Sequence, residues 1–502
     1  TFEIYDPDGN LVTMTTTYPE VQEHTQFVTN EEGWLITPEV LPFWEGYSIV
    51  EVEAPYGYVL NSDPVFFDVT PENAVSEDGI ILVIAEKENA PQKGTITIEK
   101  TGEVFSSVEI QEGKLQDRYK PIYAESGLEG AEFESRAAED IVTPDGTLRY
   151  SAGEVVDTLT TSADGTATST ELYLGKYEIV ETKAPYGMVL NEEPISVELE
   201  YAGQEVAVTS TSVSIYNERQ KVQVMLYKDL EKDELFEIGT GDEILNVYFA
   251  LYAAEDLTAA DGTIIPKDGL IEIAGVQADG TLTFSADLPI GSYYVKEYST
   301  NEHYLISEET YPVVFEYGGG DTAVVEIVVN NGDAILNEII RGSISGIKVD
   351  ENGEPLPGAV FGLFKADCTE FTKENALLTA ESAEDGSFSF TEVPYGIWQI
   401  KEISTVDGYV LSDEIFEVQI DEDGQVIELG NIENKPVTGT VETTKVDKNY
   451  PENKLSGAVF QIYQDVNGNG TFDPDIDTLY GTMEEVEQGV YRLEGLPYGD
   501  YF

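Results

Sequence analysis

The sequence predicts an all-β protein built as a tandem array of β-sandwich domains. Apolar and polar side chains alternate along most of the 502 residues, and Thr, Val, Ile, Tyr and Phe are concentrated in the alternating segments. Asp, Gly, Pro and Asn gather in the short connections between them, which favours antiparallel strands joined by tight turns. No amphipathic stretch of about 12 residues that would indicate a helix interrupts this pattern.

Repeated phrases divide the chain into units. A Gly turn, an alternating strand, a Glu and an irregular corner recur at 45–60, 174–190, 290–297 and 395–411, and a further copy starts at 496. A second phrase ending in Phe opens the units at 130–133, 247–249, 358–361 and 457–460. Phe2 falls in register with these phenylalanines, so we expect the first unit to lack its first strand. The predicted domains are 1–92, 93–220 with a long insertion, 221–341, 342–436 and a truncated 437–502.

Composition excludes several classes of function. The chain has 97 Asp or Glu and 26 Lys or Arg, a formal charge of −71, so a nucleic-acid partner is not expected. Cys368 has no second cysteine to pair with, and the two histidines, His24 and His303, offer little for His-based catalysis or a zinc site. No apolar run approaches the roughly 20 residues of a membrane span, so membrane insertion is not expected in this fragment.

Three kinds of polar residue fall on the apolar face of predicted strands. In the strand that opens the second unit, Ile96 and Ile98 lead on the same face to Lys100. A Glu in the repeated phrase and an Asn in the closing strand have the same parity as their apolar neighbours. The residues concerned are Lys100, Lys228, Lys348 and Lys445 in opening strands, Glu51, Glu181, Glu297 and Glu402 in the repeated phrase, and Asn89, Asn217, Asn337 and Asn434 in closing strands.

The spacing links these residues, because each Asn is followed 11 residues later by a Lys although the units differ in length. Burying an unpaired Lys or Glu costs several kcal/mol. One interpretation is a buried salt bridge capped by the Asn amide. The other is chemistry, because desolvation favours a neutral, nucleophilic amine and a protonated Glu, and the amine held against the carboxamide would form an amide and release ammonia. Parity and spacing leave both interpretations open.

The motifs resemble the Cna B-type (SpaA-type) domains of Gram-positive surface adhesins and pilins. The resemblance rests on the opening strand with its Lys, the Gly-Ala-x-Phe phrase, the Asp-Gly turn, Tyr-x-Ile-x-Glu-x-x-Ala-Pro-x-Gly-Tyr and the closing Asn. It covers nearly the whole chain, and 54–60 and 184–190 are its most specific segments. It implies Ig-like or prealbumin-like β-sandwiches, each with an internal Lys–Asn isopeptide bond that a Glu assists.

The resemblance assigns roles residue by residue. It pairs Lys100 with Asn217 through Glu181, Lys228 with Asn337 through Glu297, and Lys348 with Asn434 through Glu402. The first unit keeps Glu51 and Asn89 without a Lys in this fragment, and the last keeps Lys445 without its Glu and Asn. In the third unit, residues 299–304 replace the Ala-Pro corner.

The expected function is a cell-surface structural stalk or pilus-like shaft that presents an adhesive region and is stiffened by single-turnover, autocatalytic bond formation. Its partners would be other surface-protein or pilus subunits and an unidentified host or extracellular ligand. The location would be the wall-attached surface of a Gram-positive bacterium, with signal and anchor outside this fragment. The alternative is an adhesin whose domains bind a host or dietary ligand directly. Such a domain should carry a long irregular loop, and 101–130, with Arg118, Tyr119, Lys120 and Tyr123, is the candidate.

No cofactor is required, and calcium is possible in the last unit. Asp465, Asn467, Asn469 and Asp473 place oxygens at positions 1, 3, 5 and 9 of a calcium-type loop, with Gly at position 6. Position 12 is Ile476 instead of Glu. An Asx-rich hairpin turn explains the same residues.

Overall fold

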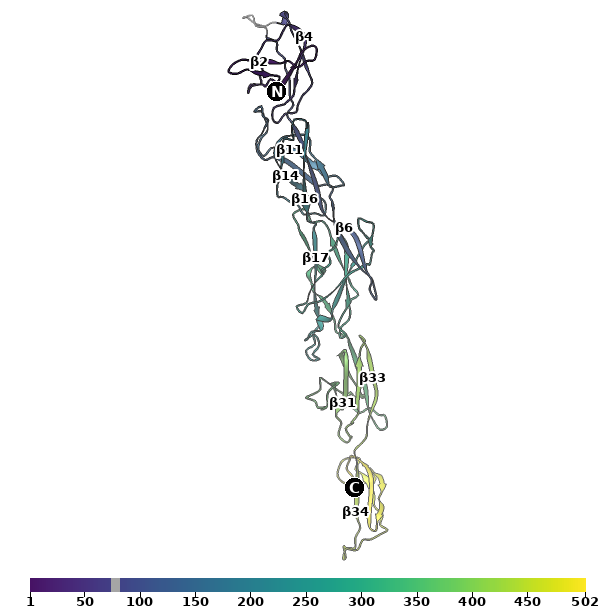
Figure 1. Cartoon of the computed structure of the whole chain (residues 1–502). Helices are drawn as coiled ribbons and strands as arrows, with labels where there is room; N and C mark the ends of the chain where they lie inside the picture. Colours follow the sequence, from purple (N-terminus) through teal and green to yellow (C-terminus); the bar gives the residue numbers. More distant parts are fainter. Residues whose placement is uncertain (74–81) are drawn as a thin grey trace.

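The computed structural model describes residues 1–73 and 82–502, which form five β-sheet units in one elongated row (Figure 1). The helical segments of the described residues are the short 3-10 turns η1 (Pro71–Asn73), η2 (Glu243–Asn246) and η3 (Val329–Gly332). None of the described helices is long and apolar enough to cross a membrane. The prediction of an all-β array is therefore confirmed. We call the units one to five, using the boundaries predicted above.

Units two, three and four are each built around two main sheets, to which units two and three each add one two-stranded sheet. Unit two comprises β6 (Lys93–Gln111), β7 (Arg118–Gly127), β8 (Glu132–Ala137), β9 (Ile141–Val142), β10 (Leu148–Tyr150), β11 (Val155–Thr160), β12 (Thr166–Thr168), β13 (Leu172–Tyr173), β14 (Gly175–Lys183), β15 (Ile195–Leu199) and β16 (Val208–Asn217). One sheet has the order β11-β8-β14-β15, and in the other β6 pairs with β12, β13 and β16.

Units three and four repeat this plan. Unit three comprises β17 (Lys221–Leu230), β18 (Tyr248–Ala253), β19 (Leu257–Thr258), β20 (Ile264–Ile265), β21 (Leu270–Gly275), β22 (Thr281–Thr283), β23 (Gly291–Ser299), β24 (Thr310–Phe315), β25 (Val324–Val328) and β26 (Ile335–Asn337). Unit four comprises β27 (Arg341–Asp350), β28 (Val360–Lys365), β29 (Leu378–Glu381), β30 (Ser387–Pro394), β31 (Gly396–Ser404), β32 (Ile415–Ile420) and β33 (Val426–Asn434). Sheets β21-β18-β23-β24 and β29-β28-β31-β32 correspond to β11-β8-β14-β15 of unit two.

The end units hold fewer strands. Unit one has the sheet β1-β4-β5, made of β1 (Phe2–Tyr5), β4 (Trp44–Glu51) and β5 (Val65–Val69), and the hairpin of β2 (Met14–Thr16) and β3 (Gln22–His24). Unit five has β34 (Thr438–Thr444), β35 (Gln461–Gln464), β36 (Thr478–Thr482), β37 (Glu484–Glu487) and β38 (Val490–Pro497). In unit one, no described strand takes the central place that β6 holds in unit two.

The two repeated phrases are neighbouring strands in one sheet. The phenylalanine that ends the opening phrase lies directly opposite the glutamate of the other phrase in four units. The pairs are Phe2 and Glu51, Phe133 and Glu181, Phe249 and Glu297, and Phe361 and Glu402. This common register places each glutamate against the core, although its neighbours on both sides in the chain point outward.

The prediction of antiparallel strands holds for the hairpins but is wrong for the first and last strands of a unit. β6 pairs with β16 in parallel, β17 with β25 and β26, and β27 with β33. The alternation of side chains is the same in both kinds of pairing, so the sequence pattern does not distinguish them. These strands stand at the two ends of a unit's sequence, so they become neighbours through folding of the whole domain and not through a connecting turn.

The insertion at 101–130 is a β-hairpin and not the irregular loop that the sequence suggested. β6 runs on past Lys100 to Gln111, and β7 returns antiparallel to it. The hairpin leaves unit two and lies along unit three (Figure 1). There Arg118 of β7 pairs in parallel with Leu270 of β21, and Phe105 accepts a backbone hydrogen bond from Ala260.

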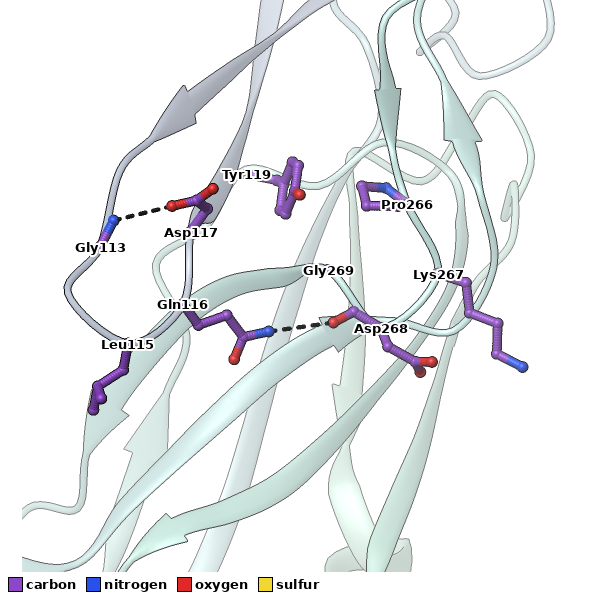
Figure 2. Close-up of a pocket in the computed structure, with 9 residues that line it drawn as sticks. All are labelled: Gly113, Leu115, Gln116, Asp117, Tyr119, Pro266, Lys267, Asp268 and Gly269. Carbon is purple, nitrogen blue, oxygen red and sulfur yellow. Dashed lines mark hydrogen bonds between the residues drawn. The ribbon is translucent and has the colours of Figure 1, made fainter.

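Side chains also fasten this hairpin to unit three. Arg219 lies over the Tyr123 ring, 3.7 Å from its centroid, and forms ion pairs with Glu103 and Asp287. At the hairpin tip, the Gln116 side chain donates to the carbonyl of Asp268, where the two units line a shallow pocket (Figure 2). Tyr119 and Tyr123 therefore face the neighbouring unit, whereas Arg118 and Lys120 stay exposed.

The two junctions of the first three units share one design. Tyr56 packs on Tyr201 of the next unit with ring centroids 4.7 Å apart, and Tyr186 packs on Tyr317 at 5.1 Å. Beside each junction a buried glutamine, Gln92 or Gln220, donates to two carbonyls of the loop that follows the second tyrosine. The tyrosine of the Ala-Pro-Tyr-Gly corner thus belongs to a joint between units.

Candidate functional site

The lysines of the opening strands are buried at the same place in three units. Lys100, Lys228 and Lys348 have relative exposures of 0%, 3% and 0%. Each Nζ donates to the main-chain carbonyl of the isoleucine opposite it on the parallel closing strand. The Nζ to O distances are 3.1 Å to Ile215, 2.8 Å to Ile335 and 2.9 Å to Ile432.

The asparagines lie two residues further along the closing strand, on the same face as the lysines. Asn217, Asn337 and Asn434 are 1–2% exposed. Each donates its Nδ2 to the glutamate of its unit, at 2.9 Å to Glu181, 2.7 Å to Glu297 and 2.8 Å to Glu402. Two independent strand pairings, Lys strand with Asn strand and Phe strand with Glu strand, thus bring the three residue types together.

Each glutamate is held from behind by a backbone amide ten residues later in the chain. The second carboxylate oxygen accepts the N–H of Asn61, Asn191, Ser307 or Ser412, at 3.0, 2.8, 2.7 and 3.0 Å. This contact fixes the carboxylate beside the asparagine, which donates to the other oxygen in Glu297, to both oxygens in Glu181 and Glu402, and to the same oxygen in Glu51. In the sequence, this contact is marked by an Asn or Ser that follows a Val-Leu or Leu-Ile pair ten residues after the glutamate.

Burial shifts the proton affinities of these groups. Desolvation lowers the pKa of the Lys100 and Lys228 ammonium groups to about 8, against the weaker opposing effect of the nearby glutamate. The pKa of Lys348 is also lowered by desolvation. Burial raises the pKa of Glu181 and Glu297. Both shifts favour a neutral amine beside a neutral acid, the combination that nucleophilic attack on a carboxamide requires.

The three clusters differ in how the carboxamide is held. In unit two, Lys100 Nζ hydrogen-bonds to Asn217 Oδ1 and lies 3.8 Å from Glu181. In units three and four, the Oδ1 atoms of Asn337 and Asn434 are buried without a hydrogen-bond partner among the described residues. There a threonine, Thr300 or Thr405, accepts a second hydrogen bond from the asparagine Nδ2. No motif in the sequence marks these threonines as part of the site.

The end units hold partial sets of these residues. In unit one, Asn89 Nδ2 donates to Glu51 at 2.6 Å and to the carbonyl of Val59. In unit five, Lys445 has the same backbone contact as its counterparts, because its N–H donates to Gly489 as that of Lys100 donates to Gly165. Its side chain is exposed, however, which differs from the buried position predicted. The described part of unit five contains no closing strand to cover it.

The possible calcium loop in unit five is held by hydrogen bonds to its own backbone. Asp465 accepts from the amides of Asn469 and Gly470, and Asn469 accepts from Thr471. Asp477, which is buried, accepts from the amides of Val466 and Asp473. In the described part of the chain, no group of three or more His, Cys, Asp or Glu side chains is placed to hold a metal. Calcium binding here stays a prediction.

Comparison with known proteins identifies the fold family. The family model of the SpaA prealbumin-like fold domain matches residues 1–80, 122–213, 237–331 and 342–435. A search of curated proteins gives no match.

Solved structures resemble the chain at low identity. The Bacillus anthracis TIE protein is 19% identical over 86% of this chain and 66% of its own length, with a TM-score of 0.47. BcpA, the major pilin subunit of Bacillus cereus, is 18% identical over 69% of this chain and all of its own, with a TM-score of 0.28. A C-terminal fragment of the pilus adhesin SpaC from Lactobacillus rhamnosus GG is 15% identical over 43% of this chain and 98% of its own, with a TM-score of 0.28. The assignment therefore rests on the family match, which covers most of the residues: the chain belongs to the SpaA prealbumin-like domain family, with four such domains in tandem.

Proposed function

We propose that this chain is a segment of a cell-surface stalk or pilus-like shaft of a Gram-positive bacterium, stiffened by autocatalytic Lys–Asn isopeptide bonds and assembled with other surface or pilus subunits. The observation that carries the proposal is the recurrence of one buried Lys, Asn and Glu cluster at the same strand register in units two, three and four. A buried ion pair alone would not need the asparagine carboxamide beside the other two groups.

The proposed reaction is a transamidation within each unit. The neutral lysine Nζ attacks the asparagine Cγ, so that an Nζ–Cγ bond forms and the Cγ–Nδ2 bond breaks. One proton leaves Nζ and one arrives at Nδ2, which departs as ammonia. The glutamate contacts Nδ2 directly and lies 3.8–4.0 Å from Nζ in units two and four, so it is placed to carry that proton.

The bond would change how the chain carries tension. The first and last strands of a unit are parallel neighbours, and pulling the two ends of a unit would otherwise shear them apart. With Lys100 joined to Asn217, force passes from β6 through the isopeptide bond into the segment that connects Asn217 to Lys228. The 11 residues to the next lysine span at most about 36 Å, and the residues between the bonded pair bear no load.

Single-molecule pulling on the full chain tests this proposal. Unfolding of an unbonded unit two would release the segment between Lys100 and Asn217, which are 117 positions apart, in a step on the order of 400 Å. The proposal predicts no such step for units two, three and four, whereas unit one, which has no lysine among its described strands, should unfold. Extension steps of full domain length from every unit would refute it.

A further inference from the structure

Units three and four carry a threonine three residues after the cluster glutamate, where units one and two carry an alanine. The threonines are Thr300 and Thr405, and the alanines are Ala54 and Ala184. The alanines belong to the Ala-Pro corner of units one and two. Units three and four lack this corner and instead carry a hydroxyl group beside the site.

Both hydroxyls touch the same atom of the cluster. Thr300 Oγ1 lies 2.9 Å from Asn337 Nδ2, and Thr405 Oγ1 lies 2.7 Å from Asn434 Nδ2. The glutamates bind this nitrogen from another side, at 2.7 Å in unit three and 2.8 Å in unit four. The carboxamide nitrogen is thus bracketed by an acid and a hydroxyl.

The two kinds of unit orient the carboxamide in different ways. In unit two, both Glu181 oxygens accept from Asn217 Nδ2, as both Glu402 oxygens accept from Asn434 in unit four. What distinguishes unit two is that Lys100 also donates to Oδ1 and so holds the carboxamide from its oxygen side. In units three and four, no described residue hydrogen-bonds Oδ1, and the threonine supplies the additional contact that keeps the carboxamide from rotating about its Cβ–Cγ bond.

We propose that Thr300 and Thr405 orient the asparagine carboxamide for attack and stabilise its departing nitrogen in units three and four; this inference rests on the proposed isopeptide function. Once Nζ has added to Cγ, Nδ2 becomes tetrahedral and carries a lone pair. The threonine oxygen continues to accept an N–H of Nδ2, as it does before attack, and so turns the lone pair of the nitrogen towards the glutamate, which delivers the proton with which ammonia leaves. The threonine supplies no net proton, so the atom balance of the reaction is unchanged.

A purely structural role would also place a hydroxyl here, because a buried N–H needs an acceptor. The two roles differ in what they change. Loss of a structural hydrogen bond lowers stability, whereas loss of the proposed contact slows bond formation in one unit and leaves the others unaffected.

The test follows bond formation in the full chain during cell-free synthesis. Samples are quenched in acid and digested, and the cross-linked peptide joining Lys348 to Asn434 is quantified against the one joining Lys100 to Asn217. The variants are Thr405→Val, which keeps the shape and removes the hydroxyl, Thr405→Ser, which restores it, and Ser404→Ala, an exposed neighbour. Unit two, which uses Ala184, serves as an internal clock in every sample.

We expect Thr405→Val to slow cross-linking of unit four by about tenfold relative to unit two, the effect of losing one hydrogen bond to a reacting group. Thr405→Ser and Ser404→Ala should match the unaltered chain, and Thr300→Val should slow unit three alone. Unchanged kinetics in Thr405→Val, or slow kinetics that Thr405→Ser fails to restore, would overturn the inference. Absence of cross-links from unit two in the unaltered chain would instead overturn the proposed function, and the inference with it.

Discussion

Replacing Glu181 by Gln should remove the cross-link of unit two and a large part of its stability. An amide cannot exchange a proton with Nζ and Nδ2, so the amine and carboxamide remain separate. The bond would close a loop of 117 residues, and the chain-entropy relation for cross-links gives about 5 kcal/mol of stabilisation for a loop of this size. For a domain of this length, that loss lowers Tm by roughly 20 °C.

The substitution also disturbs hydrogen bonds, and the chain supplies a control for this effect. Glu181 accepts from Asn217 and from the Asn191 amide, and Glu51 accepts from the corresponding Asn89 and from the Asn61 amide. Among the described residues, no lysine contacts Glu51 or the Asn89 carboxamide; Lys87 binds the Asn61 side chain instead. Glu51→Gln therefore measures the hydrogen-bond loss alone, about 1–3 kcal/mol.

Differential scanning calorimetry of the full chain, with one transition assigned to each unit by its variant, measures both effects. Glu178→Gln, on the same strand as Glu181 but facing the other way, should change the free energy of unfolding by no more than about 0.5 kcal/mol. Equal destabilisation of the two units by Glu181→Gln and Glu51→Gln would show that no cross-link is lost. Loss of ammonia at unit two in the Glu181→Gln chain would show that the glutamate is not needed for the bond.

Three further predictions follow from the same geometry. Lys348→Met should reduce the number of ammonia molecules lost by one, because only unit four loses its nucleophile. Lys365→Met, at an exposed site, should leave the mass loss unchanged. Equal mass losses in the two variants would contradict this prediction. In Asn217→Ala, Lys100 stays unbonded, and its pKa in the folded state is lowered to about 8. Between pH 8 and about 10.5 the unfolded state therefore binds one more proton than the folded state, so the free energy of unfolding, measured by urea titration, should rise with pH over this range. A flat profile would argue against a buried amine. Joining Gly102 to Gly127 through a short turn deletes the hairpin and its contacts with unit three. The distribution of distances between spin labels on units two and three should therefore broaden, whereas Arg136→Ala, away from the junction, should leave it narrow. No broadening on deletion would show that the tyrosine joint alone holds the units together.

The sequence was sufficient to predict the sheets and to select the polar residues of the clusters. Period-two alternation fixes which side chains share a face, so Lys100, Glu181 and Asn217 were assigned to the interior from parity alone. Alternation carries no information on strand direction, which is why the parallel pairing of β6 with β16 was not predicted.

Contacts that depend on tertiary arrangement were beyond the sequence. The segment 103–126 looks like a polar loop because its apolar residues, such as Phe105, are buried only against unit three. Thr405 is ordinary in sequence, and its role depends on a strand that ends 29 residues later. Lys445 follows the periodic pattern but is exposed. Alternation predicts which face of a strand a side chain lies on, but the side chain is buried only where a second layer of structure covers that face.

Intact-mass measurement of the purified full chain counts the isopeptide bonds that it contains. Each bond releases one ammonia, and units two, three and four each hold a complete cluster. We expect a mass lower than that of the sequence by three ammonia molecules. Digestion should yield cross-linked peptides joining Lys100 to Asn217, Lys228 to Asn337 and Lys348 to Asn434. A mass equal to that of the unmodified sequence would contradict the proposed cross-linking.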